Sequence, residues 1–175
     1  MQFKSMKTMY WGLALGALGA AALPAVAEPS DTEAALRGVN WQLSPGVQAP
    51  VGRNMPGFVL SNHLGYGFDA GAAVFSLGLS VPFFLLPSNF VDSRPALAGM
   101  LALQIHFPVG PVSIYAAGAG GGGGSFDGAA GPLARIGAGV QWHPSSSLSV
   151  GAEASYLRFG DLESAMLVFP IHFGP

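Results

Sequence analysis

The sequence of 175 residues contains no cysteine and few charged residues. Without cysteine, the protein can have no disulfide bond, thiol catalysis or thiolate zinc site. Charged residues make up only 9% of the chain, whereas ordinary soluble domains carry about 25%. Beyond the N-terminal segment there is also no apolar run of the roughly 20 residues that a membrane-spanning helix needs. Burial in a membrane without such helices favours a closed β-barrel, because backbone polar groups in lipid must all be bonded within the protein.

The N-terminal segment has the pattern of a secretory signal peptide. Lys4 and Lys7 precede a short apolar stretch, residues 10–23, and Ala25-Val-Ala27 supplies a small-x-small cleavage site. We expect cleavage after Ala27, and a retained signal anchor is the alternative. The remaining 148 residues contain no lysine, five arginines and nine acidic residues, a net charge of −4. This charge argues against nucleic acid as a partner.

The main feature present is a repeated alternation of apolar residues with polar or small ones. From Leu148 to Tyr156, even-numbered residues are apolar and odd-numbered ones are small or polar, which gives a strand one apolar and one polar face. In a soluble sandwich the apolar face turns inward, whereas in a transmembrane barrel it turns toward lipid. The pattern predicts eight strands near the 9–11 residues of a tilted transmembrane strand. They are Val39–Ala49, Phe58–Phe68, Gly71–Pro82, Ala96–Phe107, Val112–Gly120, Ala134–His143, Leu148–Arg158 and Ala165–Phe173.

The predicted connections alternate in length, which is expected for an outer-membrane barrel with short periplasmic turns and longer external loops. The tight turns are residues 69–70, 108–111 and 144–147, and the loops are 50–57, 83–95, 121–133 and 159–164.

These patterns predict an all-β fold, an eight-stranded antiparallel up-and-down transmembrane β-barrel over residues 39–175. A cleaved signal peptide, residues 1–27, and a short periplasmic segment, residues 28–38, precede it. That segment is either one helical turn, capped by Ser30 with Glu33 three residues on, or a disordered tail. A soluble periplasmic barrel is the alternative to the membrane location.

Across residues 39–173 the chain resembles small eight-stranded outer-membrane barrels of the OmpA type. Its last strand alternates up to the aromatic Phe173, similar to the signal that such proteins present to the barrel-assembly machinery, although Gly174 and Pro175 follow here. The alternating residues are Ala165, Leu167, Phe169, Ile171 and Phe173. The resemblance implies a bacterial outer-membrane location, with membrane lipid and the assembly machinery as partners. No peptidoglycan-binding domain follows, so we do not expect a wall-anchoring role.

Six aromatic side chains are predicted to face outward near the periplasmic strand ends, where they would form an aromatic girdle at one membrane interface. They are Trp41, Tyr66, Phe68, Phe107, Trp142 and Phe173.

Arg135 and Glu153 are the only charged residues that the predicted strands place inside the barrel. Folding their hairpin about residues 144–147 sets Glu153 nearly opposite Gly137, diagonal to Arg135. Because an isolated interior charge is costly, we expect a structural ion pair, with a proton or ion path as the alternative.

All four histidines, His63, His106, His143 and His172, are also predicted to face inward. The last three lie near the periplasmic ends of alternate strands. They could converge as a metal site or a pH-sensitive gate, whereas polar lining of the lumen is the commoner role.

The other predicted interior residues are small, so we expect a water-filled core or a slot for a small ligand, without a wide pore. They are Gly65, Gly67, Ser76, Gly78, Ser80, Ala98, Ala102, Gly137, Gly139 and Gly151.

Two prolines, Pro45 and Pro170, lie inside the first and last predicted strands, where each removes a donor from the ladder. Because these strands pair to close the barrel, we expect a weak or bulged seam.

Two motifs with catalytic or binding associations are judged weak. The run Gly120–Gly124 is followed by neither a helix nor Gly-Lys-Ser/Thr, so we interpret it as a flexible external loop and not a phosphate site. The sequence Ser61-Asn62-His63 has residue types used by lipid A deacylases, but not their His-x-Ser-Asn order, and both side chains should face inward. We therefore expect no enzyme and no cofactor.

The function favoured by the sequence is a structural or surface-interaction role through the external loops 83–95 and 121–133. The first loop contains Phe83, Phe84 and Phe90 and is apolar enough to lie on the membrane or bind another protein. A narrow channel or small-ligand carrier is the alternative, and a lipid-modifying enzyme is a third class.

Overall fold

The computed structural model describes residues 31–52, 56–86, 94–126, 128 and 130–174. The predicted signal peptide and the capping residue Ser30 lie outside the described residues. Within the described part, no helix is long and apolar enough to cross a membrane.

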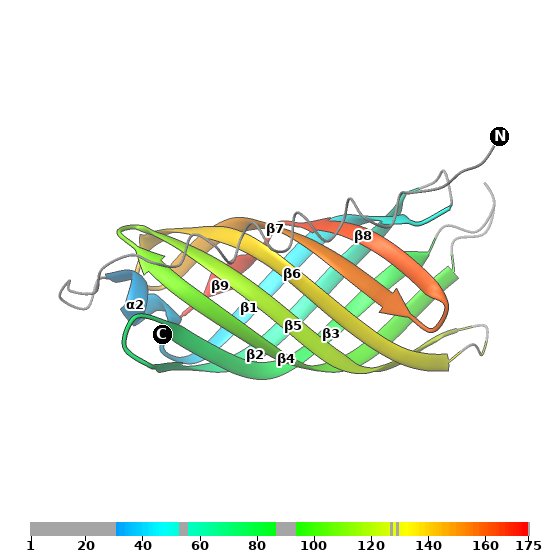
Figure 1. The fold of residues 1–175 in the computed structure, drawn as a ribbon, viewed down its shortest axis with the longest axis horizontal. Helices are drawn as coiled ribbons and strands as arrows, with labels where there is room; N and C mark the ends of the chain where they lie inside the picture. Colours follow the sequence, from blue (N-terminus) through cyan, green and yellow to red (C-terminus); the bar gives the residue numbers. More distant parts are fainter. Residues whose placement is uncertain (1–30, 53–55, 87–93, 127, 129, 175) are drawn as a thin grey trace, which may run out of the picture.

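The strands form one closed antiparallel barrel (Figure 1). Each of the first seven strands pairs with the next one in sequence, and the last two strands both pair back to the first. The strands are β1 (Gly38–Pro50), β2 (Gly57–Asp69), β3 (Val74–Leu86), β4 (Arg94–Val109), β5 (Val112–Ser125), β6 (Ala130–Ser145), β7 (Leu148–Phe159), β8 (Leu162–Val168) and β9 (Ile171–Phe173). Because β8 and β9 follow each other between β1 and β7, the wall has eight positions. The predicted eight-stranded up-and-down barrel is confirmed.

The seam between the first and last strands is interrupted without being bulged. β1 pairs with β8 and then β9 in one unbroken register, so the predicted bulge is wrong. The N–H of Phe169 donates to Pro45 O at 2.8 Å, and the N–H of Gly151 donates to Pro170 O at 2.9 Å. Each proline keeps its acceptor but has no N–H to return the bond, so the ladder loses single hydrogen bonds and keeps its alignment.

The strands extend further toward the long loops than the sequence predicts. β5 runs to Ser125 and β6 begins at Ala130, so the predicted loop 121–133 is wrong over most of its length. The run Gly120–Gly124 is paired on both sides, with β4 and with β6. A Cβ at Gly121 would lie 1.9 Å from Gly99 O, so glycine here permits close approach of two backbones.

The predicted loop 83–95 is also partly strand. β3 continues through Leu86, and β4 begins at Arg94. Phe84 is buried inside the barrel, because its place in β3 puts it on the inward face. The proposed external role of Phe84 is therefore wrong, while Phe90 lies outside the described residues.

A short helix, α2 (Asp31–Leu36), lies against the end of the barrel with the tight turns, called here the turn end (Figure 1). Its Thr32 Oγ1 donates to Gly110 O at 2.7 Å, and Ala35 and Leu36 are buried. Arg37, which follows it, forms ion pairs with Glu33 and Asp69. The helical interpretation of this segment is confirmed. The opposite end, with the longer connections, is the loop end.

Candidate functional site in the barrel lumen

The interior of the barrel is divided into two halves of different chemistry. In the half nearer the loop end, buried apolar side chains from β2, β3, β4, β6, β7 and β8 form one cluster, joined by Ala119 and Phe159 at its edge. This cluster is called the apolar seal. Its members are Val59, Phe84, Ala96, Ala98, Met100, Leu133, Leu157, Met166 and Val168.

The half nearer the turn end is lined by buried polar side chains, called here the polar half. Alternation places them inward, so their faces follow from the strand period alone. They are Asn40, Gln42, Ser44, Ser61, His63, Ser76, Ser80, Gln104, His106, Ser113, Gln141, His143, Ser149, Glu153, Ser155 and His172.

An ion pair inside the lumen joins Arg135 on β6 to Glu153 on the neighbouring strand β7. The Glu153 side chain is 0% exposed and that of Arg135 is 9% exposed, so this pair is buried. Tyr115, which the sequence analysis did not single out, donates its hydroxyl to Glu153 Oε2 at 3.0 Å. The inward position of Tyr115 follows from its alternation with Ser113 and Ala117. Its hydrogen bond to the Glu153 carboxylate does not follow from that pattern.

The strand register that brings Glu153 close to Arg135 differs from the predicted one. Glu153 lies opposite Gly139 and not Gly137, because the turn is tighter than predicted and Ser145 already pairs with Leu148. The one-residue register shift between Trp142 and Ser145 offsets part of this change. The structure still brings the two charges together, since the long arginine side chain covers the difference.

The histidines all lie inside the barrel, and all four belong to the polar half. The His106 ring stacks on Tyr115 with centroids 4.9 Å apart, and its Nε2 lies 3.2 Å from Gln104 Oε1. His143 Nε2 lies 2.9 Å from Ser113 Oγ. No group of three histidine or acidic side chains in the described part of the chain is placed to hold a metal ion. Two of the four rings thus have polar partners within the lining of the lumen.

The small interior residues make room for large neighbours and do not open the lumen. A Cβ at Gly139 would lie 2.7 Å from Tyr115 Cζ, one at Gly137 2.8 Å from Glu153 Oε1, and one at Gly65 2.6 Å from His63 Nε2. At these three positions large side chains fill the space, so the glycines do not open a ligand slot there, and the water-filled core stays a prediction.

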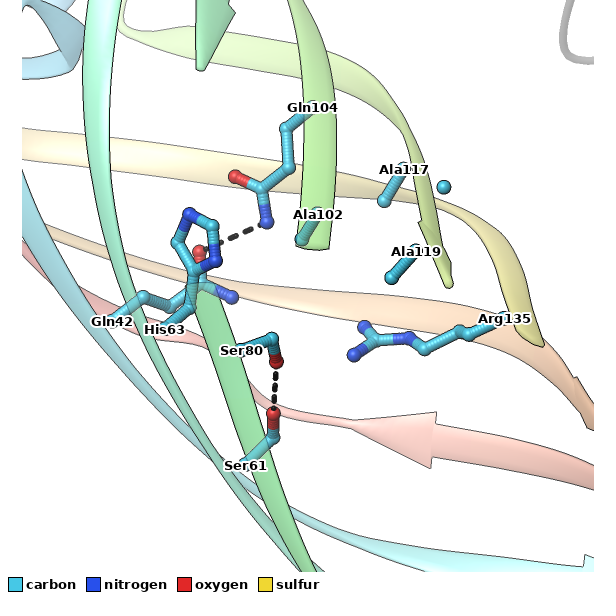
Figure 2. A pocket seen from close by; sticks show the side chains of 10 residues that line it. Gln42, Ser61, His63, Ser80, Ala102, Gln104, Ala117, Ala119 and Arg135 are labelled. Atoms are coloured by element: carbon cyan, nitrogen blue, oxygen red, sulfur yellow. Dashed lines mark hydrogen bonds between the residues drawn. The ribbon is translucent and has the colours of Figure 1, made fainter. Parts of the chain in front are cut away.

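A cavity of about 10 Å³ lies within the polar half (Figure 2). Its lining comes from the inward faces of β1 to β6 and includes His63 and Arg135. A volume of this size admits about one water molecule. It is too small for an organic ligand.

The residues of the weak Ser-Asn-His motif face this cavity and not the outer wall. Ser61 Oγ lies 3.0 Å from Ser80 Oγ. Both nitrogens of His63 have no hydrogen-bond partner among the described residues. Ser61 and His63 thus form no nucleophile–base pair.

The six aromatics of the predicted girdle lie near the turn end, and five of them are exposed on the outer wall. Trp41 stacks on Phe173 with centroids 5.0 Å apart. Phe68 stacks on Phe75, an aromatic that the prediction omitted. Phe107, the sixth, is half-buried. A membrane-interface role for these residues stays a prediction.

No protein-family model and no curated protein matches this chain. The fold is similar to that of Neisserial surface protein A, with a TM-score of 0.58 at 12% identity over 78% of this chain and 96% of that one. It is also similar to the outer-membrane enzyme PagL, with a TM-score of 0.52 at 12% identity over 75% of this chain and 97% of that one. The chain therefore has the fold of the small eight-stranded outer-membrane barrels, as the sequence resemblance indicates.

Proposed function

We propose that this chain is a bacterial outer-membrane protein whose closed barrel anchors a surface that contacts other molecules at the loop end. The outer wall supports the membrane location, because it exposes large apolar side chains around the whole barrel. Leu79 and Ile136, for example, are each 63% exposed on different sides of the barrel. An outer wall with exposed apolar side chains all around it is stable in lipid and unfavourable in water.

The observation that carries the proposal is the filled lumen. The apolar seal fills most of the loop-end half, and the turn-end half is packed with buried polar side chains around a cavity of about 10 Å³. Ions would have to cross a layer that is largely apolar, with Gln48 and Ser164 as its buried polar side chains, and burying an ion there is unfavourable. A narrow channel, the alternative function, is therefore disfavoured.

The same proposal includes lipid and the barrel-assembly machinery as partners. The last strand presents Leu167, Phe169 and Phe173 on the outer wall, in the alternating pattern noted in the sequence. At the loop end, Phe126 is 74% exposed and Val51 is 57% exposed, so apolar contacts are available to an external partner.

We further propose that the protein is not an enzyme. The histidines and the serines of the polar half are enclosed within the barrel, where a lipid substrate on the outer wall could not reach them. Mass spectrometry of the membrane lipid with and without the protein tests this proposal, and a lipid change dependent on the chain would contradict it.

The location is tested by fractionating cells and comparing gel migration of the membrane-derived protein with and without boiling. We expect a heat-dependent shift and a mature N-terminus at Glu28 by mass. Recovery in the soluble periplasmic fraction, with gel migration that does not change on boiling, would show that the proposed location is wrong.

The closed lumen is tested by reconstituting the purified barrel in planar bilayers. We expect no discrete single-channel steps, because the seal excludes water and ions. Regular conductance steps from heat-modifiable protein would favour the channel and leave the location intact.

A further inference from the structure

We infer that α2 is a plug, which closes the turn end of the barrel and can open while the barrel stays folded. The helix contacts β2 and β3 on one side and β6 on the other. In the closed wall β2 and β6 lie on opposite sides, so α2 crosses the mouth of the barrel. Figure 1 shows the helix at this end. The turn-end mouth is therefore occupied by a segment of the same chain.

The end of α2 lies within the rim of the barrel. Gly67 faces inward near the end of β2, and a Cβ there would lie 1.8 Å from the carbonyl oxygen of Leu36. A Cβ at Gly174 would lie 2.5 Å from the carbonyl oxygen of Ala35. No side chain fits between either glycine and the helix, so the two glycines leave the room that α2 occupies.

The inward side chains next to this mouth are hidden from water. Ser113 is the second residue of β5 and Ser149 the second of β7, and each is 0% exposed. Val74, the first residue of β3, is also buried. An open mouth would leave residues so near the rim in contact with water. We attribute their burial to α2, because it is the described element that crosses the mouth.

The contacts that hold α2 in place are few. Thr32 Oγ1 donates to Gly110 O at 2.7 Å, and Arg37 forms an ion pair with Asp69. Both side chains of this pair are exposed to solvent, so the pair contributes little. A helix of six residues is not stable by itself. Local opening of α2 should therefore cost much less free energy than unfolding of the barrel.

Opening of α2 would expose one half of the lumen only. The polar half lies behind the helix, whereas the apolar seal fills most of the half at the other end. Water and small solutes would then reach the buried rings of His106, His143 and His172 from the turn end. The two ends of the lumen are thus closed by different elements, of which α2 is the one that can move without disturbing the wall.

Single cysteines report on the two ends separately, because the chain has no cysteine of its own. In the full mature protein, Ser149→Cys places a thiol behind α2, and Ser164→Cys places one beside the apolar seal. Both serines are 0% exposed, and neither hydroxyl has a hydrogen-bond partner among the described residues, so the two sites are matched. The rate of reaction with a small methanethiosulfonate reagent in micelles measures how often each site opens.

Leu36→Asp and Ala34→Asp are matched changes within the plug, because Leu36 is buried and Ala34 is exposed. Burial of a leucine corresponds to about a ten- to hundredfold change in the population of the open state, and we expect Leu36→Asp to raise the reaction rate at Ser149→Cys by this factor. Ala34→Asp should leave that rate unchanged. Neither change should alter the rate at Ser164→Cys.

Gel migration with and without boiling checks that each variant keeps its folded barrel. Equal rates at Ser149→Cys with and without Leu36→Asp would overturn the inference. An equal increase at Ser164→Cys would overturn it as well, because the whole barrel would then have loosened.

A second variant covers the case in which Leu36→Asp does not fold. Thr32→Val keeps nearly the same shape and removes the hydrogen bond to Gly110. We expect it to raise the rate at Ser149→Cys by about two- to tenfold, as the loss of one hydrogen bond predicts. An unchanged rate would overturn the inference.

Discussion

The two halves of the lumen fill the same narrow barrel by different means. The apolar seal packs Phe84, Met100 and Met166 without needing any partner for a polar atom. The polar half depends on matched hydrogen bonds, and several of its atoms have none among the described residues. The seal is therefore expected to tolerate changes that keep volume, whereas the polar half is sensitive to each missing donor or acceptor.

The largest effect is expected from breaking the buried ion pair. Glu153→Gln leaves the Arg135 charge without its carboxylate in a site closed to water. We expect the free energy of unfolding to fall by about 3–5 kcal/mol. Urea titration in micelles, followed by tryptophan fluorescence, measures this change.

The control for this prediction is the double variant Arg135→Met with Glu153→Gln, which removes the unpaired charge. It should lose less stability than the sum of the single variants. Unchanged stability of Glu153→Gln would show that the pair does not stabilise the fold.

A comparable test in the other half is Phe84→Ala. Removing this ring leaves an apolar cavity in the seal, and we expect a loss of about 3 kcal/mol. Phe83→Ala is the matched control, because Phe83 is adjacent but on the outer face and only half-buried. Equal losses in the two variants, measured by the same titration, would mean that the seal is not a packed core.

A smaller effect is expected where glycine makes room for the polar network. In Gly139→Ala the new methyl would lie 2.7 Å from Tyr115 Cζ and 2.6 Å from Ala152 O. We expect a loss of about 1–3 kcal/mol from overpacking. Gly120→Ala, where a Cβ has no atom within 4 Å, should be neutral or slightly stabilising. The prediction fails if both variants unfold at the same urea concentration.

The smallest predicted effect has the opposite sign. Gln48 is a polar residue beside the seal, buried, with neither end of its amide bonded among the described residues. Gln48→Leu removes this unsatisfied group, and we expect a gain of about 1–2 kcal/mol. A lower urea midpoint for Gln48→Leu would indicate that the amide is bonded in solution.

The barrel itself was predictable because alternation is a local property. The inward faces of Arg135, Glu153 and the four histidines follow from a period of two, and the structure places each of them inside. The Gly120–Gly124 strand was missed because glycine has no side chain with which to show alternation and a low preference for strands. Only pairing with two neighbours makes that segment a strand.

The candidate site was less predictable. Tyr115 gave no signal of its contact with Glu153, since the two lie on different strands that are not neighbours. Small residues such as Gly139 indicate open space when read alone, but in the structure they lie beneath large side chains from adjacent strands.

The sequence by itself determined most of the strands, their two faces and the antiparallel pairing of neighbours, because each depends on the residues of one strand and its nearest turn. Tertiary structure decided which residues meet inside: the Arg135–Glu153–Tyr115 cluster, the apolar seal and the size of the remaining cavity. These depend on the stagger between strands around the whole barrel, and a shift such as that between Trp142 and Ser145 alters it. The alternation of residues within a single strand does not specify that stagger.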